Sequence, residues 1–321
     1  MNIELIVKKL SEQNKVYLAL KNGDTSKVKY KELRDEKWGI SDENYLNRMR
    51  LTYYILYAHI EDEEAVEWLF REELKDRKGN SFQGIGNTLN VLTFILNRYN
   101  NDGKYNEIFE EAKNANFDCS CGFDKDFQID ESIESLDLMD CIYLSQDLDY
   151  HDVMEVLVNQ WKESIEEWTD GYRNTLIRFN SFLGNEQENE TLYLVKLENA
   201  IASGKSFNIV SAYNEVIQYY ISTENVKKAG LYFRQMIGTT DFCEMITINI
   251  FREVLEECFD IISIDVNEYS DLWKWAKPYL KKQNDMYGNL YIKSIFVAKK
   301  VKDSYAMQLE REYADWKRKF D

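Results

Sequence analysis

Apolar side chains recur at steps of three and four residues along most of the chain, which is the spacing of one helix face. Between 150 and 170 this apolar stripe is formed by Val153, Val156, Leu157, Trp161, Ile165 and Trp168. Comparable stripes run through 51–59, 65–74, 89–99, 193–202, 210–220, 246–259 and 292–301. The pattern predicts about fourteen amphipathic helices.

The segments between the stripes are short and polar, as at 100–103, 184–185 and 203–205. Short connections place consecutive helices antiparallel. One proline and 13 glycines supply too few turn signals for an all-β fold. Strand-like alternation is rare, and 27–30 is too short to indicate a strand. We therefore expect an all-α fold of antiparallel helix pairs.

Two stretches repeat a spacing of apolar, aromatic and small residues. They consist of Leu92, Ile95, Tyr99, Gly103, Tyr105, Ile108, Ala112 and Ala115, and of Tyr213, Val216, Tyr220, Val226, Ala229, Phe233 and Met236. This spacing resembles the tetratricopeptide repeat, although Leu96 and Ile217 stand where that family has a small residue. The resemblance implies stacked helix pairs in an α-solenoid, and an irregular α-helical bundle is the alternative.

No linker forces a division of the chain, so we expect one helical-repeat domain over 1–321. A chain of this length is compatible with one domain or two. The most loop-like stretch, 116–130, contains Gly122 and several aspartates and is a candidate internal boundary.

Negative charge is concentrated in one part of the sequence. The chain has 40 Lys and Arg against 57 Asp and Glu, a net charge of −17. The segment 118–170 has sixteen acids and two bases, whereas 271–321 has seven acids and twelve bases. The overall charge argues against nucleic acids and anionic membranes as partners, because both attract basic surfaces.

Within that segment, five acids are expected on one solvent-facing strip of the helix from Tyr150. They are Asp152, Glu155, Glu163, Glu166 and Asp170. Like charges along a helix repel one another, and a basic partner would relieve the repulsion and associate faster through electrostatic steering. The alternative is that the strip only keeps the protein soluble.

Aromatic residues make up 14% of the sequence, and those that are not buried would line a groove. The candidates are Tyr53, Tyr57, Tyr219 and Trp273. Packing between helices is the alternative for each of them, and it is the one that a helical array favours.

The residue types that carry catalysis or bind metals are scarce. There are two histidines, His59 and His151, and the cysteines Cys119, Cys121, Cys141, Cys243 and Cys258 are irregularly spaced. This predicts no metal site, no cofactor and no catalytic residues, and it is typical of a reduced, cytoplasmic protein. We see no secretory signal and no apolar stretch long enough to span a membrane.

These features favour a cytosolic protein-binding module over an enzyme. By type, an acidic protein with few motifs is similar to bacterial immunity proteins, and the residue usage is typical of an AT-rich bacterial genome. The most concrete hypothesis is an immunity protein whose acidic face covers a basic cognate toxin. A regulatory solenoid that senses a peptide, and a hydrolase that uses Asp or Glu, remain the alternatives.

Overall fold

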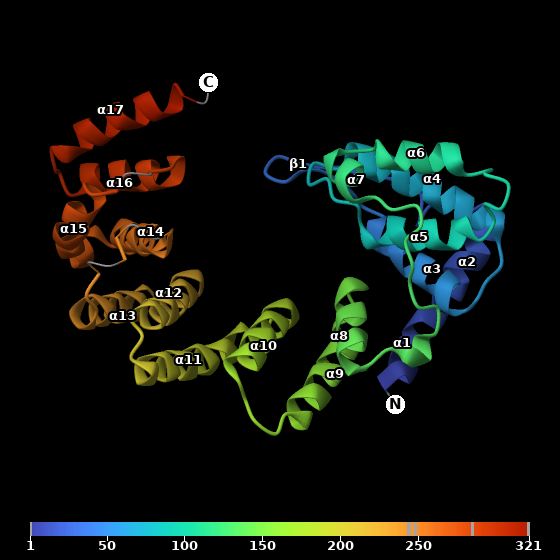
Figure 1. The fold of residues 1–321 in the computed structure, drawn as a ribbon, viewed down its shortest axis with the longest axis horizontal. Coiled ribbons are helices and arrows are strands. Elements are labelled where there is room, and N and C mark those ends of the chain that lie inside the picture. Colours follow the sequence, from blue (N-terminus) through green and yellow to red (C-terminus); the bar gives the residue numbers. More distant parts are fainter. Residues whose placement is uncertain (1, 243–244, 247–248, 284–285, 320–321) are drawn as a thin grey trace. The chain divides into compact units, whose positions relative to one another are not determined.

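The structure is a computed structural model that describes residues 2–242, 245–246, 249–283 and 286–319. Seventeen α-helices and one two-stranded hairpin lie within these residues, which confirms the predicted all-α class (Figure 1). The chain divides into two compact units, Met1–Glu167 and Trp168–Asp321. The candidate boundary at 116–130 lies inside the first unit. None of the helices in the described ranges is long and apolar enough to cross a membrane.

The first unit contains nine helices and the hairpin among its described residues. In chain order they are α1 (Asn2–Ser11), α2 (Asn14–Lys21), β1 (Glu32–Asp35), β2 (Gly39–Asp42), α3 (Tyr45–Tyr57), α4 (Glu63–Gly79), α5 (Asn87–Asn97), α6 (Asn106–Lys113), α7 (Phe117–Gly122), α8 (Leu138–Asp147) and α9 (His151–Ser164). Helix α5 packs against α3 and α4, α8 packs against α9, and α1 contacts both α3 and α8. Apolar residues of α3, α4 and α5, such as Leu51, Leu69 and Leu92, are fully buried between these helices.

The antiparallel hairpin pairs Glu32 with Asp42 and Asp35 with Gly39. All four residues of β1 are exposed, so the strand shows no alternation of buried and exposed positions. That is why the sequence pattern did not predict it. The turn is held by Asp35, whose Oδ1 accepts from the backbone N–H groups of Lys37 and Trp38 at 2.8 Å each.

The second unit contains eight α-helices within the described residues. They are α10 (Asp170–Leu183), α11 (Asn189–Ser203), α12 (Ser206–Ser222), α13 (Val226–Thr239), α14 (Asn249–Ile264), α15 (Val266–Leu280), α16 (Gly288–Lys300) and α17 (Tyr305–Lys317). The pairs α12/α13, α14/α15 and α16/α17 follow one another, and their first helices stack α12 on α14 and α14 on α16 (Figure 1). This is the arrangement of stacked pairs that the repeat spacing implies.

Small residues allow the helices of this stack to approach closely. Ala229 of α13 is fully buried, and a Cβ atom added at Gly230 would clash with the Tyr269 ring of α15. The predicted repeat 213–236 therefore coincides with a packed pair, α12/α13. The other predicted repeat begins in α5, which packs mainly against α4 and α3.

The helix predicted over 150–170 is wrong at its C-terminal end. Helix α9 ends at Ser164, Ile165 is extended, and a new helix, α10, begins at Asp170. Thr169 caps α10 by accepting from the backbone N–H of Tyr172 at 3.2 Å. Asp170 also favours the start of α10, because an acid interacts favourably with the N-terminus of a helix.

Candidate partner-binding surface

The five acids of the predicted strip do not share one helix. Asp152, Glu155 and Glu163 lie exposed on α9, Glu166 lies in the segment after it, and Asp170 is the first residue of α10 in the second unit. All five are exposed, as expected, but only the first three form a strip on one helix.

The acids also differ in whether they already have a partner. The Lys9 ammonium lies 2.7 Å from a carboxylate oxygen of Asp152, and this contact lowers the pKa of Asp152. Asp170 lies 3.0 Å from the Arg173 guanidinium. By contrast, Glu155, Glu163 and Glu166 make no ion pair within the residues that the structure describes. These three carboxylates are available to an incoming cation.

The wider acidic segment is almost entirely on the surface. Of its sixteen acids, fifteen are exposed and Glu131 is half-buried. By sequence, the first unit has 35 acids and 20 bases, whereas the second has 22 acids and 20 bases. Some of these acids stabilise the fold: Asp137 and Asp140 form a capping box on α8, and Glu131 lies 2.9 Å from Arg98. The first unit therefore carries most of the chain's net negative charge, and nearly all of its acids from residue 118 onward are exposed to solvent.

The four aromatic candidates fall into two groups. Tyr53 and Trp273 are buried, with 6% and 4% of their surface exposed, so neither lines a groove and both pack between helices, the alternative that a helical array favours. Trp273 packs in the core of the second unit and its indole Nε1 donates to Asp303 at 2.8 Å. Tyr57 is half-buried and stacks on Tyr53, and Tyr219 is half-buried beside Tyr193.

Three aromatic side chains that sequence reasoning missed are more exposed than any of the four candidates. Trp38, Phe82 and Phe117 are 56%, 65% and 71% exposed. The rings of Trp38 and Phe82 lie 6.2 Å apart, where the hairpin meets the loop after α4. Their exposure could have been predicted from their neighbours in the sequence, because each of the three lies within a polar stretch and belongs to no apolar stripe.

Hydrogen bonds tie this hairpin to the loop. The Ser81 backbone N–H donates to the Ile40 carbonyl at 2.9 Å, and the Ile40 N–H donates to Ser81 Oγ at 2.7 Å. The loop also has left-handed backbone at Gln83 and Gly84, with φ of 55° and 78°. The position of Phe82 is therefore fixed by backbone contacts and not by burial of its ring.

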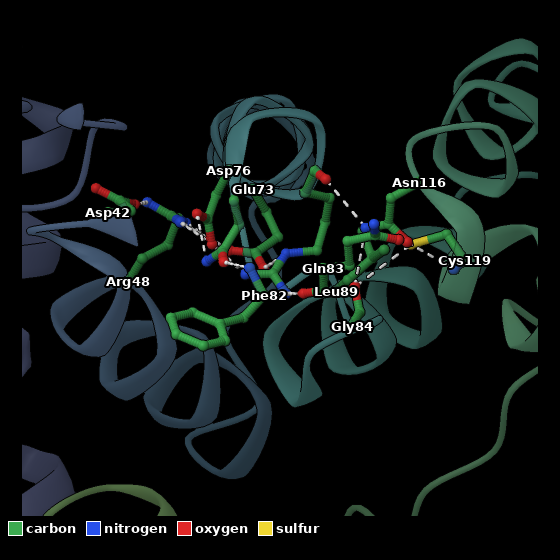
Figure 2. Close-up of polar contacts among 12 residues, drawn as sticks. Asp42, Arg48, Glu73, Asp76, Phe82, Gln83, Gly84, Leu89, Asn116 and Cys119 are labelled. Carbon is green, nitrogen blue, oxygen red and sulfur yellow. Dashed lines mark hydrogen bonds and ion pairs between the residues drawn. The ribbon is translucent and has the colours of Figure 1, made fainter. Parts of the chain in front are cut away.

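A buried cluster of five charged side chains lies under the hairpin and the loop. It consists of Asp42, Arg48, Glu73, Asp76 and Arg77 (Figure 2). The Arg48 guanidinium lies 2.6 Å from Asp42 and 2.8 Å from Glu73, and Arg77 Nε lies 3.1 Å from Glu73. Burial raises the pKa of Glu73, and the two guanidinium groups oppose that rise. Three acids and two bases are thus packed together with almost no exposed surface.

The cluster extends to the loop through Arg77. The Arg77 guanidinium donates to the Gln83 carbonyl at 3.2 Å. The Asn116 amide donates to the carbonyls of Arg77 and Gly84, at 3.0 Å each (Figure 2). Because the side chains of Asp42, Arg48 and Glu73 have no exposed surface, no substrate can reach them. The cluster therefore has a structural role: it fixes the hairpin and the loop to α3 and α4.

The histidines and cysteines form no catalytic or metal-binding arrangement in the described part of the chain. His151 Nε2 lies 2.8 Å from Asp149, and His59 lies 3.9 Å from Glu131. No group of three His, Cys, Asp or Glu residues there could hold a metal ion. Cys119, Cys141 and Cys258 are buried and Cys121 is exposed, while Cys243 lies outside the described residues.

Comparison of the chain with protein-family models, with curated proteins and with solved structures finds no match.

Proposed function

We propose that this protein is a protein-binding module whose acidic first unit binds a basic partner. The observation that carries the proposal is the set of exposed carboxylates along and after α9 that lack an ion pair in the described chain, Glu155, Glu163 and Glu166. They lie in a segment where acids far outnumber bases. The carboxylates of such a surface repel one another in the free protein, and cations of a partner that neutralise them relieve this repulsion.

In its most concrete form, the proposal is a cytoplasmic immunity protein that covers the basic active face of a cognate toxin. Inhibition would be steric and electrostatic: the carboxylates pair with Lys or Arg side chains, and the bulk of the unit blocks access. Long-range attraction would also raise the association rate. The proposal assigns no catalytic activity and no cofactor to the chain.

The test is affinity capture from the lysate of the native host, with elution by rising salt. The bait is compared with the triple variant Glu155→Gln, Glu163→Gln and Glu166→Gln. A matched control replaces three exposed acids elsewhere, Glu107, Glu198 and Glu224, by Gln, so that the net charge changes equally.

We expect a basic protein that the wild type and the control retain and the triple variant loses. We also expect salt to release it, because screening weakens exposed ion pairs. Equal capture by all three baits would contradict the proposed surface, and would indicate that these acids serve only solubility.

A further inference from the structure

A polar groove runs across three consecutive parts of the second unit. One pocket lies between α11 and α12 and includes Glu215, the next includes Glu215, Gln218 and Ser222, and the third includes Gln218 and Ser222 with residues of α14 and α16. Their volumes are about 240, 250 and 490 Å³. Each pocket shares lining residues with the next, so the three adjoin one another along α12, and we refer to them together as the groove.

A single face of α12 forms the floor of this groove. Ser211, Glu215, Gln218 and Ser222 follow one another at steps of four, three and four residues, which places them on one helix face. The face spans about 16 Å at a rise of about 1.5 Å per residue. That length matches about five residues of an extended chain at about 3.3 Å each.

The groove is much more acidic than the unit that contains it. Glu257 is buried, with 4% of its surface exposed, and is counted as neutral. The other charged residues that line the groove are six carboxylates and two bases, Lys196 and Lys293. The six are Asp170, Glu186, Glu215, Glu253, Glu256 and Asp260. By sequence, the rest of the second unit has 18 bases and 15 acids. The negative charge of this unit is therefore gathered in the groove, which includes one residue of the predicted strip, Asp170.

The two lysines do not neutralise the whole groove. Lys293 lies 2.9 Å from Glu256 and 2.7 Å from Asp260, and Lys196 pairs with Glu215. In contrast, Glu186 and Glu253 are exposed and make no ion pair within the described ranges. Each is open to a cation from outside, Glu186 in the second pocket and Glu253 in the third.

The other lining groups suit a peptide. Hydroxyls and amides such as Ser211, Gln218 and Ser222 can pair with the backbone N–H and C=O groups of an extended chain. The rings of Tyr193 and Tyr219, 5.3 Å apart, offer flat surfaces on which the stems and charges of Lys or Arg can rest. The described carboxylates are not arranged to hold a metal ion, and the charge opposes nucleic acid.

We propose that this groove binds an extended segment of a partner protein that carries Lys or Arg at alternate positions, with their side chains directed to Glu186 and Glu253. Alternate side chains of an extended segment point to the same side, so two cations two residues apart can both face the groove. This site is on the second unit and does not rest on the proposed role of the first.

The test uses the full chain and two labelled hexapeptides in fluorescence anisotropy at about 100 mM salt. One peptide alternates lysine and serine, and the other has glutamine in place of lysine. The groove variant is Glu186→Gln with Glu253→Gln. One control is Glu198→Gln with Glu224→Gln, on the same unit outside the groove, and the other is Glu155→Gln with Glu163→Gln, on the first unit. All three pairs change the net charge equally.

We expect the lysine peptide to bind and the glutamine peptide to bind at least tenfold more weakly. The groove variant should weaken the lysine peptide about tenfold, because two ion pairs are lost, and each control should change it less than twofold. Ser222→Trp, which fills the groove without changing charge, should weaken binding similarly, and circular dichroism checks that each variant is folded.

Three results would overturn this inference. Equal weakening by all three paired variants would mean general attraction to an acidic protein. Displacement of the peptide by spermidine at equal concentration of positive charge would assign the groove to a small polyamine. If the lysine peptide does not bind, the proposed binding site is wrong. Since the first-unit pair is measured separately, none of these results decides the proposed function of α9.

Discussion

Replacing Arg48 by methionine should destabilise the first unit by about 3–5 kcal/mol. The Arg48 side chain has no exposed surface, and its guanidinium lies 2.6 Å from Asp42 and 2.8 Å from Glu73 (Figure 2). Its removal leaves three buried carboxylates, including Asp76, around Arg77 alone in this cluster. A buried carboxylate that loses its counter-ion retains the full cost of desolvation, which is why the loss is large.

Urea unfolding followed by far-UV circular dichroism measures this loss, and hydrogen exchange of α3 and α4 locates it. The control is Lys31→Met, which removes an ion pair of similar length, 2.6 Å to Glu43, whose side chains are 55% and 50% exposed. That variant should lose less than about 1 kcal/mol. The Arg48→Met difference should shrink on acidification, because protonation neutralises the stranded carboxylates. A loss under about 1 kcal/mol, or one that grows at low pH, would refute the reasoning.

Three further predictions concern the second unit. The contacts of Asp303 with Lys277 and Trp273 lower the pKa of Asp303 to about 2. They should therefore add about 2 kcal/mol of stability, which is present above about pH 4 and is lost as the pH falls toward 2. The urea midpoints of the wild type and Asp303→Asn across this pH range measure this contribution. Gly230→Ala should cost about 1–3 kcal/mol in thermal unfolding because its Cβ would meet the Tyr269 ring, whereas Gly238→Ala, with nothing within 4 Å, should be neutral or stabilising, and equal effects would contradict the packing argument. Burial raises the pKa of Glu257 well above its usual range, so stability should fall as the pH rises through the unfolded-state pKa of about 4.3. Glu257→Gln should unfold at the same temperature as the wild type near pH 4 and at a higher temperature at pH 8. A lower unfolding temperature of Glu257→Gln at pH 8 would contradict this prediction.

The helices were predictable because their apolar stripes are regular, and the stripe of α4 shows where this reading stops. Val66, Leu69 and Phe70 of α4 are fully buried, and the same helix face continues through Glu73 and Arg77. Charged residues in a sequence indicate solvent-facing positions, so the apolar stripe predicted from the sequence ends at Leu74 and does not reveal the buried cluster. The partners Asp42 and Arg48 come from other elements, and no local spacing reveals such pairing.

The acidic surface was predictable in its composition but not in its layout. The exposure of nearly all acids in 118–170 follows from their number, since few carboxylates can be buried in one fold. Helix α10 starts anew because Thr169 caps it. The apolar periodicity continues through Ile165 and Trp168, so the sequence pattern predicts one uninterrupted helix at this point. The groove of the second unit combines residues of α12, α14 and α16, so it becomes visible only when the helices are stacked.

The most direct test of the proposed function is the association rate of a captured basic partner with the full chain, measured at about 50 and 500 mM salt. We expect an association rate that falls steeply as salt rises for the wild type and for the control variant of Glu107, Glu198 and Glu224. We expect a slower and less salt-dependent rate for the variant of Glu155, Glu163 and Glu166. A rate that is the same for all three proteins and independent of salt would contradict binding through the acidic surface.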